Sequence, residues 1–314
     1  MNPSFPEPAG HTKRFVDFKE ADLLPKEIIL LAESSSEDRG QLPLWKRMLC
    51  TDAQRMISVG ENNSEKALIK KGEAPAREVL LRNEEEIKEI ISVERLLIDI
   101  SGLPHHVWAP ILKSAYEMKV PTRVMYAEPD KYTLHPTPAS ETMFDLSVSF
   151  DGLAPLPGFL QLTEPADDSK CLFVALLGFE GNRPKRLIYQ IEPEPVVIPV
   201  VGVPGFKMEF PAYTITCNRS LFSEFHAHAN IHFVRASCPF DTYETLTEIK
   251  ANYPDYYMYL APVGTKPHSL GAILYAIKHS EETEIMFDHP VRKAGRTEGI
   301  GIIHIYDFGC FDEL

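Results

Sequence analysis

The stretch Tyr256–His279, YYMYLAPVGTKPHSLGAILYAIKH, decides the fold class. Its first part, Tyr257 to Pro262, is apolar and rich in β-forming residues, which is typical of a strand buried on both faces. Apolar side chains then recur at spacings of three and four residues, and this predicts a helix with one face turned to the core. These side chains are Leu270, Ile273, Leu274 and Ile277. A strand, a short turn and a helix in this order indicate an α/β sheet.

The turn between the predicted strand and helix has the features of an anion-binding loop. At the carboxyl edge of a parallel sheet, a helix N-terminus offers free N–H groups and the positive end of the helix dipole. Gly264 permits close approach of the backbone, Thr265 suits a helix cap, and Lys266 adds a positive charge. We select Gly264, Thr265, Lys266, His268 and Ser269 as candidate ligand-binding residues. An ordinary strand-to-helix turn explains the same pattern, because the full Walker motif is absent.

The same strand, loop and helix order recurs from residue 95 onward. Leu96 to Ile100 reads as a strand, Val107 to Met118 as a helix, and Thr122 to Tyr126 as the next strand. Another apolar strand is expected at Cys171 to Leu177. We therefore predict a Rossmann-like, mostly parallel sheet flanked by helices over residues 95–314, and a less regular α/β region over 1–94. A proline-rich excursion at 130–169 interrupts the pattern. A long loop of this kind is expected either to cover the ligand-binding edge as a lid or to form a dimer contact.

If these strands share one parallel sheet, the loops after them meet at one edge. This predicts a ligand site in which Arg183 and Lys266 neutralise phosphate while neighbouring polar groups orient a base or ribose. The alternative for Glu180 and Asn182 is that they only cap a helix. The further candidate ligand-binding residues are Ser101, Gly102, His105, Glu128, Glu180, Asn182 and Arg183.

Composition and motifs exclude several classes of protein. The 314 residues carry a formal net charge of −13, which argues against an extended nucleic-acid surface. The sequence has no apolar run of membrane-spanning length and no signal-peptide core, so we expect a cytoplasmic protein without membrane contact. The five cysteines are scattered, and neither a nucleophile elbow nor a G-x-G-x-x-G fingerprint is present. We therefore predict no metal and no cofactor, and the catalytic residues, if any, remain unknown.

Two turns resemble those of the Rossmann-like sensor domains associated with CRISPR systems, called CARF domains. The matching residues are Asp99-Ile100-Ser101-Gly102 after an apolar strand, and Gly264-Thr265-Lys266 before a helix. The resemblance covers about half of the chain. It implies a parallel sheet, homodimerisation and binding of a cyclic oligonucleotide or related nucleotide, with Ser101, Gly102, Thr265 and Lys266 as binding positions. No ribonuclease or restriction-type effector motif follows the sheet.

The amino-acid sequences of three segments are also similar to those of uncharacterised bacterial proteins from defence-type gene neighbourhoods. These segments are IDISGLPHH, LGFEGNR and APVGTKPHSLG. The leading functional expectation is a homo-oligomeric protein that binds a nucleotide or another anionic small molecule, as a sensor or accessory component of bacterial antiphage defence. The second is an enzyme that hydrolyses or transfers a group on such a ligand. The third is a subunit that binds a protein partner encoded in the same operon.

Overall fold

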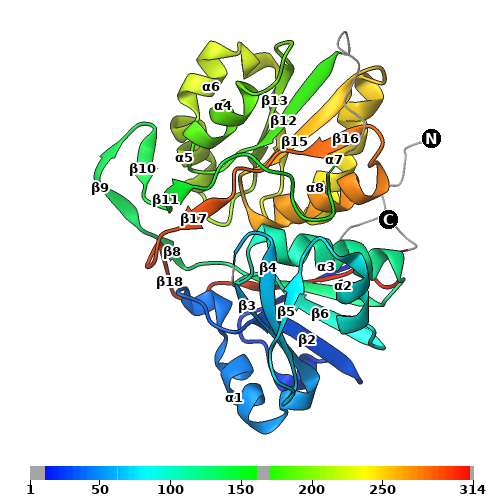
Figure 1. Ribbon diagram of the computed structural model, residues 1–314. Coiled ribbons are helices and arrows are strands. Elements are labelled where there is room, and N and C mark those ends of the chain that lie inside the picture. Colours follow the sequence, from blue (N-terminus) through cyan, green and yellow to red (C-terminus); the bar gives the residue numbers. More distant parts are fainter. Residues whose placement is uncertain (1–10, 62, 161–169, 312–314) are drawn as a thin grey trace, which may run out of the picture. The chain divides into compact units, whose positions relative to one another are not determined.

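Strands in the computed structural model, which describes residues 11–61, 63–160 and 170–311, belong to two separate main sheets (Figure 1). The expectation of one sheet running from residue 95 to the end of the chain is therefore wrong. Unit 1 comprises Met1–Lys131 and Thr297–Leu314, and unit 2 comprises Tyr132–Arg296. The expected boundary at residues 94 and 95 falls inside unit 1, because β6 (Arg95–Asp99) pairs in parallel with β2 (Glu27–Ala32).

Unit 1 is built on an eight-stranded sheet in the order β1-β19-β7-β6-β2-β3-β4-β5. Its four central strands, from β7 to β3, run parallel, and antiparallel strands complete both sides. The strands are β1 (Thr12–Phe15), β2, β3 (Met56–Glu61), β4 (Lys66–Lys71), β5 (Arg77–Leu80), β6, β7 (Thr122–Ala127) and β19 (Ile303–Asp307). The helices are η2 (Glu20–Asp22), η3 (Asp38–Gly40), α1 (Pro43–Thr51), η4 (Ala53–Arg55), α2 (Glu84–Ile90) and α3 (His105–Glu117).

Unit 2 contains a five-stranded, wholly parallel sheet in the order β14-β13-β12-β15-β16. The strand and helix predicted in Tyr256–His279 are confirmed as β15 and α8. The strands are β12 (Cys171–Leu176), β13 (Val196–Gly202), β14 (His232–Val234), β15 (Tyr257–Pro262) and β16 (Thr283–Ile285). The helices are α4 (Asn182–Ile188), α5 (Phe210–Cys217), α6 (Arg219–Glu224), η5 (Ala227–Asn230), α7 (Pro239–Asn252) and α8 (Lys266–Lys278).

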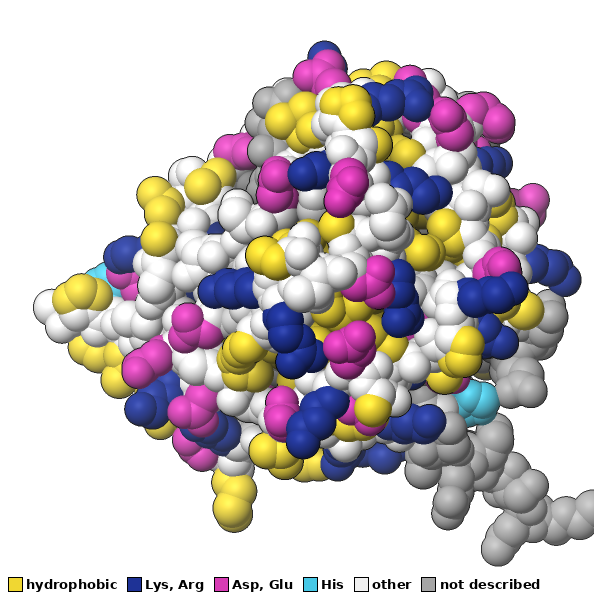
Figure 2. Space-filling view, turned by 90° about the horizontal axis from the view of Figure 1, so that it is seen from below, with side chains coloured by type: hydrophobic (Ala, Val, Ile, Leu, Met, Phe, Trp, Pro, Cys, Tyr) yellow, Lys and Arg dark blue, Asp and Glu magenta, His cyan; other side chains and the backbone are white. Residues whose placement is uncertain are grey.

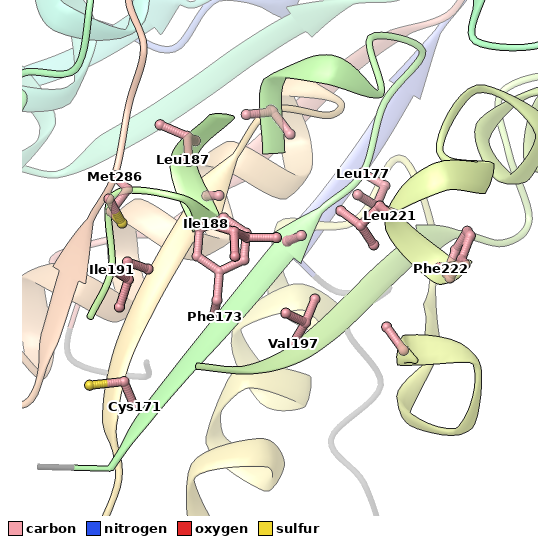
Figure 3. Packing of buried hydrophobic residues seen from close by; sticks show 14 of the residues in the cluster. Cys171, Phe173, Leu177, Leu187, Ile188, Ile191, Val197, Leu221, Phe222 and Met286 are labelled. Carbon is pink, nitrogen blue, oxygen red and sulfur yellow. The ribbon is translucent and has the colours of Figure 1, made fainter. Parts of the chain in front are cut away.

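The core of unit 2 forms because its central strands are apolar on both faces. Phe173, in the middle of β12, lies against Leu187 and Ile188 of α4, and all three side chains are buried (Figure 3). Helices α7 and α8 pack against each other over the opposite face of the sheet (Figure 1). Their crossing is close at Gly271, where a Cβ atom would lie 2.4 Å from the carbonyl oxygen of Pro239. The sheet is thus covered on both sides, as a parallel sheet requires.

The proline-rich excursion, which from Tyr132 onward belongs to unit 2, is structured where it is described. It supplies a hairpin of β9 (Leu134–Ala139) and β10 (Thr142–Phe144), and β10 packs against α5. A further short strand, β11 (Ser147–Phe150), pairs with β17 (Pro290–Arg292). The remaining short strands are β8 (Lys131–Tyr132) and β18 (Thr297–Glu298). Residues 161–169 of the excursion lie outside the described residues. Across the part of the chain that is described, no helix is both long and apolar enough to cross a membrane.

Candidate ligand-binding site

The residues selected from the sequence lie at the carboxyl ends of strands in both sheets, so they do not form one rim. Ser101, Gly102, His105 and Glu128 belong to unit 1, and the other selected residues belong to unit 2. The reason is the pairing of the strands: β6 and β7 are neighbours in the first sheet, whereas β12 and β15 are neighbours in the second. The candidate site must therefore be considered within each unit.

In unit 2, the loops after β12 and β15 touch at a pair of glycines. A Cβ atom on Gly178 would lie 3.0 Å from Gly264 Cα, and one on Gly264 would lie 2.5 Å from the carbonyl oxygen of Leu177. The strand order reverses at this position, because chain order runs from β12 outward to β14 on one side and from β15 to β16 on the other. Such a switch point is where open α/β sheets bind ligands. Gly264, selected from the sequence, lies at its centre.

Three of the selected side chains hold the β15–α8 turn in place. Thr265 caps α8, accepting a hydrogen bond from the His268 amide, and its Oγ1 donates to the carbonyl oxygen of Ala236 at 2.8 Å. The ring of His268 is fully buried and its Nε2 lies 3.0 Å from the carbonyl oxygen of Arg235. Ser269 Oγ donates to the carbonyl oxygen of Pro262 at 3.3 Å. These groups position the turn, a different role from the ligand contact expected from the sequence.

The turn contains two basic side chains, Lys266 and His268. Burial lowers the pKa of His268 to about 4, so its ring adds no positive charge at pH 7. Lys266 is the first residue of α8 and only 6% exposed. A cation in such surroundings interacts more strongly with an anion than it would in water. The lysine therefore remains the best anion-binding candidate in the turn.

Arg183 has a structural role in place of the phosphate contact expected for it. Its guanidinium is buried and forms a two-pronged pair with Asp288, with Nη2 to Oδ1 at 2.6 Å and Nε to Oδ2 at 3.0 Å. Nη1 donates to Glu180 Oε2 at 3.3 Å. Burial by itself would lower the pKa of Arg183, but the hydrogen bonds and charges of these two carboxylates raise it. The positive charge is thus neutralised within the unit, and Glu180 is a partner of the arginine.

Unit 1 has a similar glycine contact at its own switch point, between β2 and β6. A Cβ atom on Gly102 would lie 2.9 Å from the carbonyl oxygen of Gly40. Ser101 is buried: its amide donates to Asp99 Oδ1 at 2.9 Å, and its Oγ accepts from the Ala127 amide at 2.8 Å. Its polar groups are therefore used to join β6 to β7.

Of the remaining selected residues of unit 1, Glu128 has a hydrogen-bond partner within the chain and His105 lies at the start of a helix. Glu128 Oε1 lies 2.6 Å from Nε2 of His304 on β19, and His105 is the first residue of α3. A buried ion pair that the sequence did not reveal lies at the same edge, where Arg39 contacts Glu37 at 2.8 Å. Arg39 also donates to the hydroxyl of Tyr126 at 3.1 Å. This edge of unit 1 is occupied by its own polar network.

An aromatic cluster at the carboxyl edge of unit 2 was also missed by the sequence analysis. Phe179 contributes to it from the loop after β12, and Phe210 and Tyr213 contribute from the start of α5. Rings from the excursion complete the cluster, which consists of Tyr132, Phe144, Phe179, Phe210 and Tyr213. Phe179 lies in the segment LGFEGNR, but no local sequence pattern indicated its contact with the excursion.

On the face shown in Figure 2, Lys and Arg side chains are interspersed with Asp and Glu. Within the described ranges, no group of three or more His, Cys, Asp and Glu residues is arranged to hold a metal ion. The five cysteines are free, and burial raises the pKa of Cys238 to about 11, which keeps its thiol protonated at pH 7.

Comparisons with known proteins add little to this geometry. No protein-family model and no curated protein matches the sequence. Among solved structures, the chain is similar to a periplasmic ribose ABC transporter from Conexibacter woesei DSM 14684, with 13% sequence identity and a TM-score of 0.27. The match covers 81% of this chain and 69% of that one. A likeness at this level carries no argument about ligand or function.

The glycine contact leads to a stability prediction. Gly264→Ala is expected to lower the free energy of unfolding by about 1–3 kcal/mol, because the new methyl group would meet the backbone of Leu177. Gly60→Ala is the matched control, since the one atom that its methyl group would approach too closely is a carboxylate oxygen of Glu33, an exposed side chain, while Leu68 lies at ordinary contact distance. Urea unfolding of both variants measures the difference. Equal stability losses in the two variants would refute the close packing at the switch point.

Proposed function

We propose that unit 2 binds a nucleotide, or another small phosphate-bearing ligand, at the carboxyl edge of its sheet. The observation that carries this proposal is the switch point between β12 and β15, where the loops contain Gly178 and Gly264 in backbone contact. Only residues without a side chain allow this approach, and the carboxyl edge of a parallel sheet at a switch point is the usual position for a ligand.

The phosphate is assigned to the start of α8. This helix is 13 residues long and begins at Lys266, directly after the Gly264-Thr265 turn. Its amide dipoles and the lysine ammonium both favour an anion at this end. Since the whole chain carries a net charge of −13, the attraction must come from such a local arrangement.

The biological role is proposed from the resemblance of the Asp99-to-Gly102 and Gly264-to-Lys266 turns to those of CARF domains. This resemblance supports a role as a sensor, or as an accessory component of bacterial antiphage defence, with a cyclic oligonucleotide or a related nucleotide as the ligand. Homo-oligomerisation, a cytoplasmic location and a protein partner from the same operon stay predictions of the sequence.

Calorimetric titration of the full chain tests the proposed site. The ligands are AMP, ATP, cyclic di-AMP, cyclic tetra-adenylate and inorganic pyrophosphate. Lys266→Met is expected to weaken binding roughly 10- to 100-fold, the loss of one charge-assisted hydrogen bond. Lys278→Met, at the other end of the same helix, is the matched control and is expected to bind like the original protein.

Three results would bear on the proposal. Absence of binding by every ligand would refute it, and so would equal affinity of the Lys266→Met variant and the original protein. Chromatography of the titrated samples separates a sensor from an enzyme, because an enzyme would convert the bound nucleotide. If the bound nucleotide were converted, the proposed binding site would stand, but its role would be catalysis and not sensing.

A further inference from the structure

On the basis of the proposed nucleotide site, we infer that Phe179 is the surface on which the nucleobase stacks, and that Phe144 of the β9–β10 hairpin occupies this stacking position in the structure. The two rings lie 4.4 Å apart with an interplanar angle of 17°. Aromatic side chains stack on bases in this parallel arrangement. The hairpin is thus a built-in competitor for the base.

The Phe144–Phe179 pair differs from the other ring contacts of the aromatic cluster. Phe179 meets Tyr132, Phe210 and Tyr213 edge-on, at interplanar angles of 85°, 83° and 81°. Among the described rings of the cluster, Phe144 is thus the one that stacks parallel to Phe179. A flat group that replaced Phe144 would stack on the same face of Phe179.

The stacking surface is adjacent to the proposed phosphate position. Phe179 directly follows Gly178, whose backbone is in contact with Gly264 at the start of the β15–α8 turn. One ligand can therefore place its phosphate at Lys266 and its base at Phe179. This geometry selects a nucleotide over a phosphate compound without an aromatic group.

A buried acceptor beside the cluster has no partner among the described residues. Asn218 is 0% exposed, and its Nδ2 donates to the carbonyl oxygens of Gly178 and Thr214, both at 2.8 Å. Its Oδ1 is buried and receives no hydrogen bond within the described residues. The preceding residue, Cys217, packs in the hydrophobic cluster with Phe144. An N–H group of a base could complete the hydrogen bonding of Asn218, which is costly to leave unmade.

The hairpin is attached in a way that permits displacement. Among the described residues, β9 and β10 pair only with each other, and the cluster that contains Phe144 is separate from the main core of unit 2. A further attachment is the carboxylate of Glu141, which accepts a hydrogen bond from the Ser220 amide at 3.0 Å. Lifting the hairpin leaves the parallel sheet intact.

The two members of the stacked pair are predicted to have opposite effects. Phe179→Leu is expected to weaken AMP binding about 10-fold, the loss of one base–aromatic stack, with pyrophosphate binding unchanged. Phe144→Leu is expected to tighten AMP binding, because the competing ring is removed. Glu141→Ala removes the acceptor of the Ser220 amide without touching the rings, and it is expected to tighten AMP binding as well. Tyr189→Leu, an exposed ring outside the cluster, is the control.

Calorimetry with AMP and with pyrophosphate distinguishes this inference from the proposed function. Binding of neither ligand by the original protein would refute the proposed function. Equal affinity for both ligands, with no change in Phe179→Leu, would refute the stacking surface alone. Weaker AMP binding in both Glu141→Ala and Phe144→Leu would show that the hairpin supports the site instead of competing with the base. Circular dichroism of each variant verifies that unit 2 is folded.

Discussion

Replacing Arg183 by methionine is expected to lower the free energy of unfolding by roughly 3–5 kcal/mol, because the Asp288 carboxylate would remain buried without its partner. The two side chains join the start of α4 to the segment after β16. Urea unfolding followed by circular dichroism measures the loss. Substituting both residues, as Arg183→Met with Asp288→Leu, should recover much of it, since neither charge is then buried alone.

Arg186→Met is the matched control for this prediction. Arg186 lies on the same helix, is exposed, and contacts the ring of Phe150. We expect its replacement to change stability by less than about 1 kcal/mol. If Arg183→Met were as stable as the control but bound nucleotide more weakly, the arginine would be a ligand contact, as the sequence suggested, and its pairing with Asp288 would be incidental.

The second large effect is a loss of stability in acid caused by His268. Its pKa is about 4 in the folded protein because the ring is buried, and about 6.5 in an unfolded chain. Between these values the unfolded state binds more protons, so the stability from this group is complete above pH 6.5 and falls as the pH decreases to 4. The total loss is on the order of 3 kcal/mol.

Urea unfolding at pH 7.5, 6.5, 5.5 and 4.5 measures the contribution of His268. The His268→Gln variant keeps a nitrogen donor for the carbonyl oxygen of Arg235 but does not titrate. Its stability should therefore fall less steeply with decreasing pH than that of the original protein. His228→Gln, at an exposed position of unit 2, should leave the slope unchanged. Parallel curves for the original protein and His268→Gln would contradict the buried, neutral histidine.

Local pattern was sufficient to predict individual elements of the fold. The strand and helix within Tyr256–His279 were identified because apolar spacing and a capping threonine at residue 265 are local signals. The assignment of strands to sheets was not predictable in this way. Strand β6 pairs with β2, and the chain leaves unit 1 after Lys131 and returns at Thr297. Such pairing depends on contacts between distant segments, and no local pattern reports them.

The candidate site was predicted in part for the same reason. Gly264 was selected because a glycine after a strand indicates close approach of backbones, and the contact with Gly178 is consistent with that reasoning. Arg183 was assigned to phosphate because it carries a positive charge in a loop after a strand. Its actual partner, Asp288, could not be recognised because it is 105 residues away in sequence. The stacking of Phe144 on Phe179 and the hydrogen bonds of Asn218 likewise join distant segments. Charge and residue type indicate chemistry, but only the fold shows which partner a side chain has.

Hydrogen–deuterium exchange of the full chain, with and without a saturating nucleotide identified by titration, tests the central claim most directly. We expect slower amide exchange in the two switch-point loops of unit 2, residues 177–181 and 263–269, and no comparable change in the corresponding loops of unit 1, residues 33–40 and 100–106. Protection confined to the loops of unit 1 would contradict it.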